Sequence, residues 1–176
     1  MTPRRLTAAV CLAAIVLLLV GAFSKRWFVA DLRTSELNGS LRMGLTGVSA
    51  CMATVDATHC EQVTWSQLQS LYGGRLDDGG WMWLGRITFG LALAAAIALA
   101  SLAGFALLES RVAMPALVPT VAQWCCGALL PLMAGYWLLT PGAFAAIAAG
   151  RGFAFAGLGA IAGIVAASRE TSDRLD

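Results

Sequence analysis

Four long apolar segments constrain this chain of 176 residues more than any other feature. A helix needs about 20 apolar residues to cross the hydrocarbon core of a bilayer. We therefore predict four transmembrane helices, over 6–23, 85–108, 112–139 and 151–167. Charged residues make up only 12% of the chain, about half the fraction usual in soluble domains. The fold class we expect is an all-α membrane bundle, forming one domain over 1–176.

The first apolar segment has a second interpretation. Arg4 and Arg5 precede it, and Ala22-Phe23-Ser24 follows the small-x-small pattern of a signal-peptide cleavage site. The apolar run is long for the hydrophobic region of a signal peptide, so we favour a retained helix. The cleaved signal peptide stays an alternative.

Residues 24–80 form a polar stretch, which we predict to be an extramembrane loop domain. Runs rich in β-branched and aromatic residues alternate there with turn residues at Asn38-Gly39 and at 56–58. We expect a small antiparallel sheet with strands near 27–29, 41–48, 51–55 and 60–65. A short helix is expected over 66–72.

The positive charges that flank the spans do not by themselves decide the orientation of the helices. Four spans place both termini on one side of the bilayer. A disulfide in the polar loop would require an oxidising compartment. We therefore expect cytoplasmic termini and an extracytoplasmic loop, in a bacterial inner membrane or a plasma membrane.

Cys51 and Cys60 flank a turn sequence in the polar loop. Neighbouring antiparallel strands could bring the two residues within bridging distance, and we predict a structural disulfide. A catalytic dithiol is the alternative, although such pairs are usually spaced as C-x-x-C beside a helix N-terminus.

Several kinds of chemistry lack the residues they need. His59 is the one histidine, so we expect no metal site, and we predict no cofactor. A net charge of +2 without a long basic run argues against nucleic-acid binding. No acidic residue lies within the four predicted spans to pair with Arg86 or Arg151. We therefore interpret these two arginines as anchors at the membrane surface.

Two helices carry small residues four positions apart, a spacing that permits close backbone approach. These pairs are Gly159 with Gly163 and Ala100 with Gly104. We predict that both pairs pack within the bundle.

The order of several residues resembles the claudin and peripheral myelin protein 22 group of tetraspan membrane proteins. The likeness is carried by Trp27 after the first helix, Gly44-Leu45, the pair Cys51 and Cys60, and Arg86 at the mouth of the second helix. Thr46 stands where that family has a second tryptophan. The resemblance implies a distant, bacterial claudin-like member, and it implies the fold more than a junction function.

These features favour a non-enzymatic structural or accessory subunit that binds copies of itself, or a larger membrane complex, through the loop sheet. Its other partner is the lipid bilayer. Two alternatives remain: a membrane thiol-disulfide oxidoreductase of the quinone-linked four-helix type, and a small transporter or channel subunit.

Overall fold

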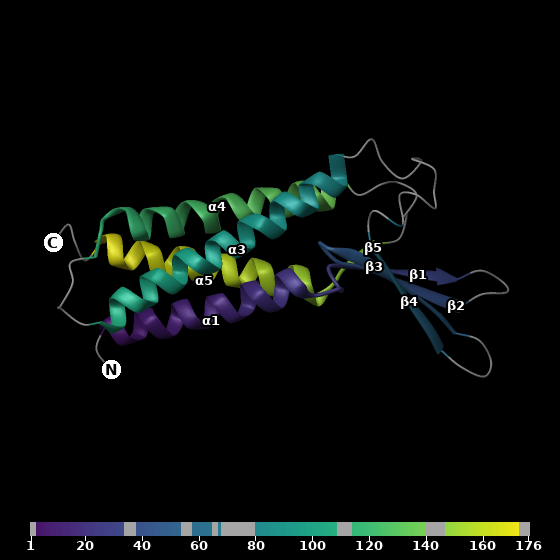
Figure 1. Ribbon diagram of the computed structural model, residues 1–176, viewed down its shortest axis with the longest axis horizontal. Helices are drawn as coiled ribbons and strands as arrows, with labels where there is room; N and C mark the ends of the chain where they lie inside the picture. Colours follow the sequence, from purple (N-terminus) through teal and green to yellow (C-terminus); the bar gives the residue numbers. More distant parts are fainter. Residues whose placement is uncertain are drawn as a thin grey trace.

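The computed structural model describes residues 3–33, 38–53, 58–64, 67, 80–108, 114–139 and 147–172. Four helices run side by side as an elongated bundle (Figure 1). They are α1 (Pro3–Phe23), α3 (Gly80–Leu107), α4 (Leu117–Leu138) and α5 (Arg151–Ser172). Each is long and apolar enough to cross a membrane. The described part of the chain therefore contains four helices with the length and composition of membrane spans.

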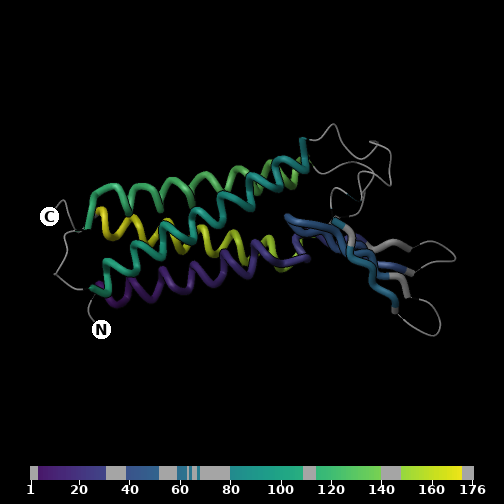
Figure 2. The backbone as a smooth tube through the Cα atoms, viewed as in Figure 1, coloured from purple at the N-terminus to yellow at the C-terminus, as the bar shows by residue number. Residues whose placement is uncertain are grey.

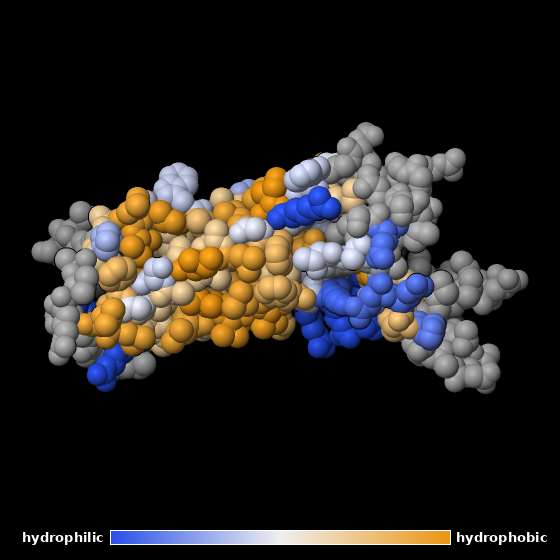
Figure 3. All heavy atoms as spheres, in the orientation of Figure 1, coloured by the Kyte–Doolittle hydropathy of each residue, from blue (hydrophilic) through white to orange (hydrophobic). Residues whose placement is uncertain are grey.

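The helices form a ring in which each packs mainly on two neighbours, and α3 also contacts α5 across the ring. α1 lies against α3 and α5, and α4 lies against the same two helices (Figure 2). α1 begins and α5 ends at one end of the bundle, and the sheet lies beyond the other end (Figure 1). Apolar residues cover the visible side of the bundle, whereas hydrophilic residues gather on the sheet (Figure 3).

Three helix boundaries differ by five residues from those predicted. α3 begins at Gly80 rather than at 85, so that Trp81 and Trp83 belong to its first turns. α5 continues to Ser172, beyond the predicted end at 167. α4 begins only at Leu117, after Pro115. Residues 112 and 113 of the predicted span lie outside the described residues.

The sheet has five antiparallel strands in the order β4-β3-β2-β1-β5. The strands are β1 (Phe28–Arg33), β2 (Asn38–Met43), β3 (Gly47–Ala53), β4 (Thr58–Thr64) and β5 (Ile147–Ala149). The predicted small antiparallel sheet is confirmed. β5 was not predicted, because three residues are too few to show an alternating pattern.

Three predictions within the sheet are wrong. Asn38-Gly39 does not form a turn but begins β2. The strand predicted over 41–48 is instead the end of β2 and the start of β3, which are divided by a tight connection at 44–46. The separate strand predicted over 51–55 is, as far as Ala53, the continuation of β3. The backbone N–H of Gly44 donates to the carbonyl of Gly47 across this connection, at 2.8 Å. The predicted helix over 66–72 lies outside the described residues apart from Gln67.

Small residues allow the helices of the bundle to approach closely. A Cβ atom on Gly159 would lie 2.9 Å from the backbone nitrogen of Leu18 in α1. One on Gly163 would lie 2.6 Å from the Cys126 sulfur in α4, and one on Gly21 2.7 Å from the backbone nitrogen of Ala156. The expected packing of Gly159 and Gly163 is thus present.

The expected packing of Ala100 and Gly104 within the bundle is wrong. Ala100 is exposed, and a Cβ atom on Gly104 would meet nothing within 4 Å. The buried positions of α3 include Ala96, Leu99 and Ala103. Successive side chains on a helix point about 100° apart. Ala100 and Gly104 each follow a buried residue by one position, so they face away from the core.

The two glycines give a matched test of this packing. Gly159→Ala forces a methyl group against the α1 backbone and should destabilise the fold by about 1 to 3 kcal/mol. Gly104→Ala enters open space and should be neutral or stabilising by up to about 1 kcal/mol, since alanine favours helix. Thermal unfolding of both variants in detergent measures the difference. Equal effects would contradict the close contact of α1 with α5.

Candidate interaction site: the sheet and its junction with the bundle

Six aromatic residues join the sheet to the end of the bundle. We call them the junction cluster: Trp27, Phe28, Trp81, Tyr136, Trp137 and Phe153. They come from the start of β1 and from the neighbouring ends of α3, α4 and α5. Large rings at this position bury apolar area while their polar atoms find partners at the rim.

Tyr136 lies at the centre of the junction cluster and is 1% exposed. Its ring stacks on Trp81 with a centroid separation of 4.7 Å. It also contacts Phe28 at 5.2 Å and the edge of Trp27 at 6.1 Å. Gly85 lies one turn beyond Trp81, and a Cβ atom there would come within 3.1 Å of the tyrosine ring.

The polar atoms of the junction cluster bond across elements. The Trp27 indole N–H donates to the Gly21 carbonyl at 2.6 Å, and the Trp81 indole N–H donates to the Tyr136 carbonyl at 2.8 Å. The Tyr136 hydroxyl donates to the Gly44 carbonyl at 3.4 Å. Among the described residues, no buried side-chain nitrogen or oxygen lacks a partner. These bonds join α1 to the residue before β1, α3 to α4, and α4 to the β2–β3 connection.

The chain that enters α5 passes very close to β1. The Gly150 N–H donates to the Trp27 carbonyl at 2.7 Å, and the Gly152 N–H donates to the Arg26 carbonyl at 3.0 Å. A Cβ atom on Gly150 would lie 2.0 Å from the Arg26 oxygen, and one on Gly152 2.7 Å from the Trp27 ring. Both positions therefore require glycine for close approach.

From the sequence we expected the Trp27 ring to be buried beside the disulfide, with its N–H bonded to a carbonyl, and only part of this expectation holds. The side chain is fully buried and its N–H bonds a carbonyl, as expected. It does not lie beside the disulfide, because Cys51 pairs with Ser40 and Ser40 with Asp31. Asp31 is four residues from Trp27, roughly 13 Å along a strand.

The other predicted loop residues have structural positions. A Cβ atom on Gly44 would lie 2.7 Å from the Ser24 carbonyl oxygen, and Leu45 is buried. Arg86 is exposed on α3, with its guanidinium carbon 5.4 Å from the centre of the Trp83 ring. Tyr136, Phe153 and the two close-approach glycines were not singled out from the sequence. A Tyr-Trp pair near the end of an apolar span is, in the sequence alone, typical of the membrane surface.

The predicted disulfide between Cys51 and Cys60 is confirmed. The two residues are directly opposite in β3 and β4, with Cα atoms 4.1 Å apart. Cys51 is buried, whereas Cys60 is exposed on the last strand of the sheet. The remaining cysteines, Cys11, Cys125 and Cys126, are free and lie in the helices.

The two faces of the sheet differ in chemistry. Residues that pair in register share a face, and alternate rows face opposite sides. One face carries Phe28, Met43 and Val48, and then Ala30, Leu41 and Ala50. The other carries Val29, Arg42, Ser49 and Gln62. The apolar face packs on the junction cluster at its inner row, where Phe28 contacts Tyr136.

β4 forms one edge of the sheet and is polar and exposed. The side chains of His59, Cys60, Glu61, Gln62 and Thr64 are all exposed. In the described part of the chain, no strand pairs with the outer side of β4. Lys25 bonds the side chain of Gln62. The edge is therefore a row of exposed polar side chains, and one of them, Gln62, is bonded to Lys25 of the same chain.

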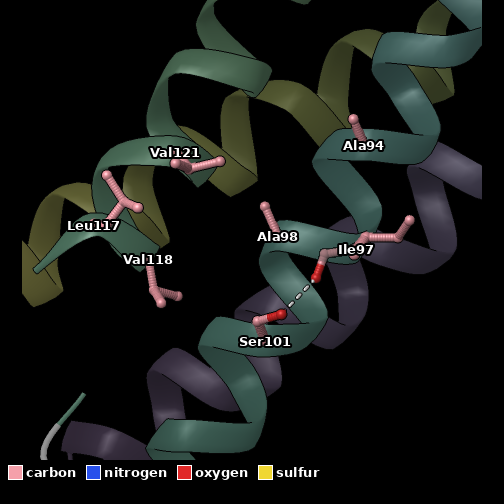
Figure 4. Close-up of a pocket in the computed structure, with 7 residues that line it drawn as sticks. All are labelled: Ala94, Ile97, Ala98, Ser101, Leu117, Val118 and Val121. Carbon is pink, nitrogen blue, oxygen red and sulfur yellow. Dashed lines mark hydrogen bonds between the residues drawn. The ribbon is translucent and has the colours of Figure 1, made fainter. Parts of the chain in front are cut away.

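A second accessible feature is a groove between α3 and α4 (Figure 4). Its cavity volume is about 380 Å³, and it is lined by Ala94, Ile97, Ala98, Ser101, Leu117, Val118 and Val121. The one hydroxyl in this lining, that of Ser101, donates to the Ile97 carbonyl at 3.1 Å. The groove lies among helices that could cross a membrane, and it offers only apolar contact.

The described residues contain no group of three or more His, Cys, Asp or Glu side chains arranged to hold a metal ion. Comparisons with models of known protein families and with curated proteins find no match. The site is therefore characterised by its own geometry.

Trp27 should be essential for the attachment of the sheet. Trp27→Ala removes a fully buried ring and should destabilise by about 3 to 5 kcal/mol. Trp27→Phe keeps much of the apolar contact and should cost about 1 kcal/mol for the lost hydrogen bond. Trp83→Ala is the control, because that side chain is 62% exposed. The measurement is thermal unfolding in detergent. Equal melting temperatures for all three variants would contradict the role of Trp27 in the junction cluster.

Proposed function

We propose that this protein is a non-enzymatic membrane protein that acts as a structural or accessory subunit and binds other proteins through its sheet. The observation that carries the proposal is a polar, exposed edge strand on a sheet that the junction cluster attaches firmly to the bundle. An exposed strand edge offers unpaired N–H and C=O groups, which other chains can pair with.

The proposed placement puts the sheet outside the cell and both termini in the cytoplasm. Disulfides persist in oxidising compartments, and the Cys51–Cys60 bond belongs to the sheet. The membrane is a bacterial inner membrane or a plasma membrane. The arrangement of four helices, a disulfide-bonded sheet, buried Trp27 and the Gly44-Leu45 connection supports a claudin-like relationship.

Site-specific crosslinking tests this function directly. A photoreactive amino acid in place of Gln62, on the exposed edge strand, should form adducts with protein in native membranes. The same amino acid in place of Ile97, which is exposed on α3, should react mainly with lipid. Absence of any protein adduct from position 62 would contradict the proposal.

One observation favours a second candidate function, thiol-disulfide exchange. Cys60 is exposed, so a thiolate could reach its sulfur, attack it and release Cys51 as the leaving group. A protein of this kind would oxidise or reduce a dithiol partner.

The reduction potential separates the two functions. We expect the Cys51–Cys60 bond to be structural, with a potential below about −300 mV, whereas exchange enzymes lie at about −120 to −270 mV. Replacing both residues with Ser should lower stability by about 2 to 3 kcal/mol. Cys125→Ser is the control, because that thiol is free. A potential in the exchange range, or quinone reduction that the double variant loses, would establish the oxidoreductase.

A further inference from the structure

We infer that four basic side chains at the sheet end of the bundle bind the phosphate groups of anionic phospholipids in the membrane leaflet on that side. We call these residues the basic rim: Lys25, Arg26, Arg86 and Arg151. The inference goes beyond the proposed function, because the ligand is a lipid of the surrounding membrane and not a protein.

The fold places Arg26 and Arg151 side by side. The backbone N–H of Gly152 donates to the Arg26 carbonyl at 3.0 Å, and a Cβ atom on Gly150 would lie 2.0 Å from the same oxygen. Arg151 stands between these two glycines in the chain, so α5 begins directly against the segment that leaves α1. Lys25 precedes Arg26 in that segment. Three of the four cations therefore meet where α1 ends and α5 begins.

Arg86 joins the basic rim from α3. In the ring of helices, α1 lies between α3 and α5. Phe23 is the last residue of α1, and its ring contacts that of Phe89 in α3 with centroids 5.4 Å apart. Arg86 lies about one helical turn nearer the start of α3 than Phe89, and Lys25 is two residues beyond Phe23. Four positive charges thus follow an arc from α3 over α1 to α5.

The basic rim lies at the depth of the lipid headgroups. The apolar span of α1 ends at Phe23, and that of α5 begins at Arg151. From Arg86 to Leu107 at the end of α3, the helix measures roughly 32 Å, close to the thickness of the hydrocarbon core. The Arg86 guanidinium lies over the ring of Trp83, which is 62% exposed, and exposed tryptophan is typical of the membrane–water interface. Lipid phosphates are therefore at the level of these cations.

The basic rim faces the surrounding lipid. All four of its side chains are exposed. Ile87 beside Arg86 is exposed as well, and so is Leu158, which follows Arg151 by about two turns of α5. Apolar residues cover the visible side of the bundle up to the sheet, and strongly hydrophilic side chains gather at that boundary (Figure 3). A phospholipid there can place its chains on apolar surface and its phosphate against the cations.

The acidic residues in the described part of the chain lie elsewhere. Glu61 belongs to the apolar face of the sheet, whereas Lys25 bonds Gln62 of the other face. Asp31 is in the row of strand partners that contains the disulfide, farther from the bundle. Glu170 lies near the end of α5, at the opposite end of the bundle (Figure 1). Within the described residues, no cation of the basic rim forms an ion pair.

A phosphodiester matches this unpaired charge. Guanidinium groups bind phosphate oxygens with two parallel hydrogen bonds, and basic clusters next to a membrane attract anionic lipids. Packed helices lie about 8 to 10 Å apart, so the arc from α3 to α5 spans roughly 16 to 20 Å. A bound lipid therefore contacts cations of neighbouring helices. The depth of the basic rim favours phosphates of the bilayer over free phosphate and over acidic protein.

Lipid binding by charge variants tests the inference. The full-length protein in mild non-ionic detergent is titrated with phosphatidylglycerol and with phosphatidylcholine, and bound lipid is counted by native mass spectrometry. Wild type should prefer phosphatidylglycerol. Arg26→Gln/Arg151→Gln should weaken its binding about 25-fold, since each basic side chain near a membrane surface contributes roughly a factor of five. Binding of phosphatidylcholine should not change. Arg26→Lys/Arg151→Lys keeps both charges and should retain most of the affinity.

The matched control removes two charges from the other end of the bundle. Arg4→Gln/Arg169→Gln alters two exposed residues there, one of which adjoins Glu170, and it should leave phosphatidylglycerol binding unchanged. Thermal unfolding without added lipid should be alike for all variants, because every altered side chain is exposed.

Four outcomes would overturn the inference. Equal weakening by the two Gln pairs would show a response to net charge rather than a site. Loss of binding in the Lys pair would exclude an electrostatic site. Displacement of phosphatidylglycerol by millimolar inorganic phosphate would make the ligand a free anion. A photoreactive amino acid in place of Arg151 that reacts in native membranes with protein and not with lipid would make the partner an acidic protein.

Discussion

The stacking of Tyr136 on Trp81 is the contact on which the rest of the structure depends. A small sheet of short strands has little apolar surface of its own and gains stability by packing on another element. Here that element is the end of a helix bundle, where neighbouring chain ends would otherwise leave polar backbone groups unpaired. The ring of Tyr136 fills the centre, and its hydroxyl reaches the Gly44 carbonyl in the sheet. One side chain thus connects the helices to the β2–β3 connection.

The helices of the bundle are held together by a different interaction, the close packing of small residues. In a bilayer there is little hydrophobic gain from bringing helices together, so close packing of small residues supplies much of the attraction. Gly21 and Gly159 bring α1 and α5 into backbone contact. This closeness lets the chain pass from α1 into β1 beside the start of α5, where Gly150 and Gly152 bond to the backbone of Arg26 and Trp27.

The sequence predicted those parts of the fold that local patterns determine. Four apolar segments predicted four helices, and the spacing of Cys51 and Cys60 predicted their disulfide. The extent of β2 and β3 was not predictable in the same way, because their boundary depends on contacts of Gly44 with Ser24, which is distant in sequence. β5 likewise owes its existence to pairing with β1.

The packing predicted for Ala100 and Gly104 was wrong because the sequence does not show which side of α3 faces the bundle. A small-xxx-small spacing states that two residues share a face, but it does not state which face meets a neighbour. On α3 the neighbours lie against the face of Ala96, Leu99 and Ala103 instead. Tyr136 was missed for a related reason. An aromatic pair at a helix end is typical of the membrane surface, and only the tertiary structure shows that Tyr136 is buried while Trp137 is partly exposed.

The disulfide and the junction cluster stabilise different parts of the sheet, and this division bears on binding. The junction holds the inner row, whereas Cys51–Cys60 ties the edge strand to β3 three rows farther out. An edge strand is bonded to its sheet on one side only and would fray without such a tie. A partner that pairs with a frayed strand must also offset the entropy of ordering it, and a preordered strand avoids this cost. The disulfide thus holds β4 in order for the partner that we propose to bind this edge of the sheet.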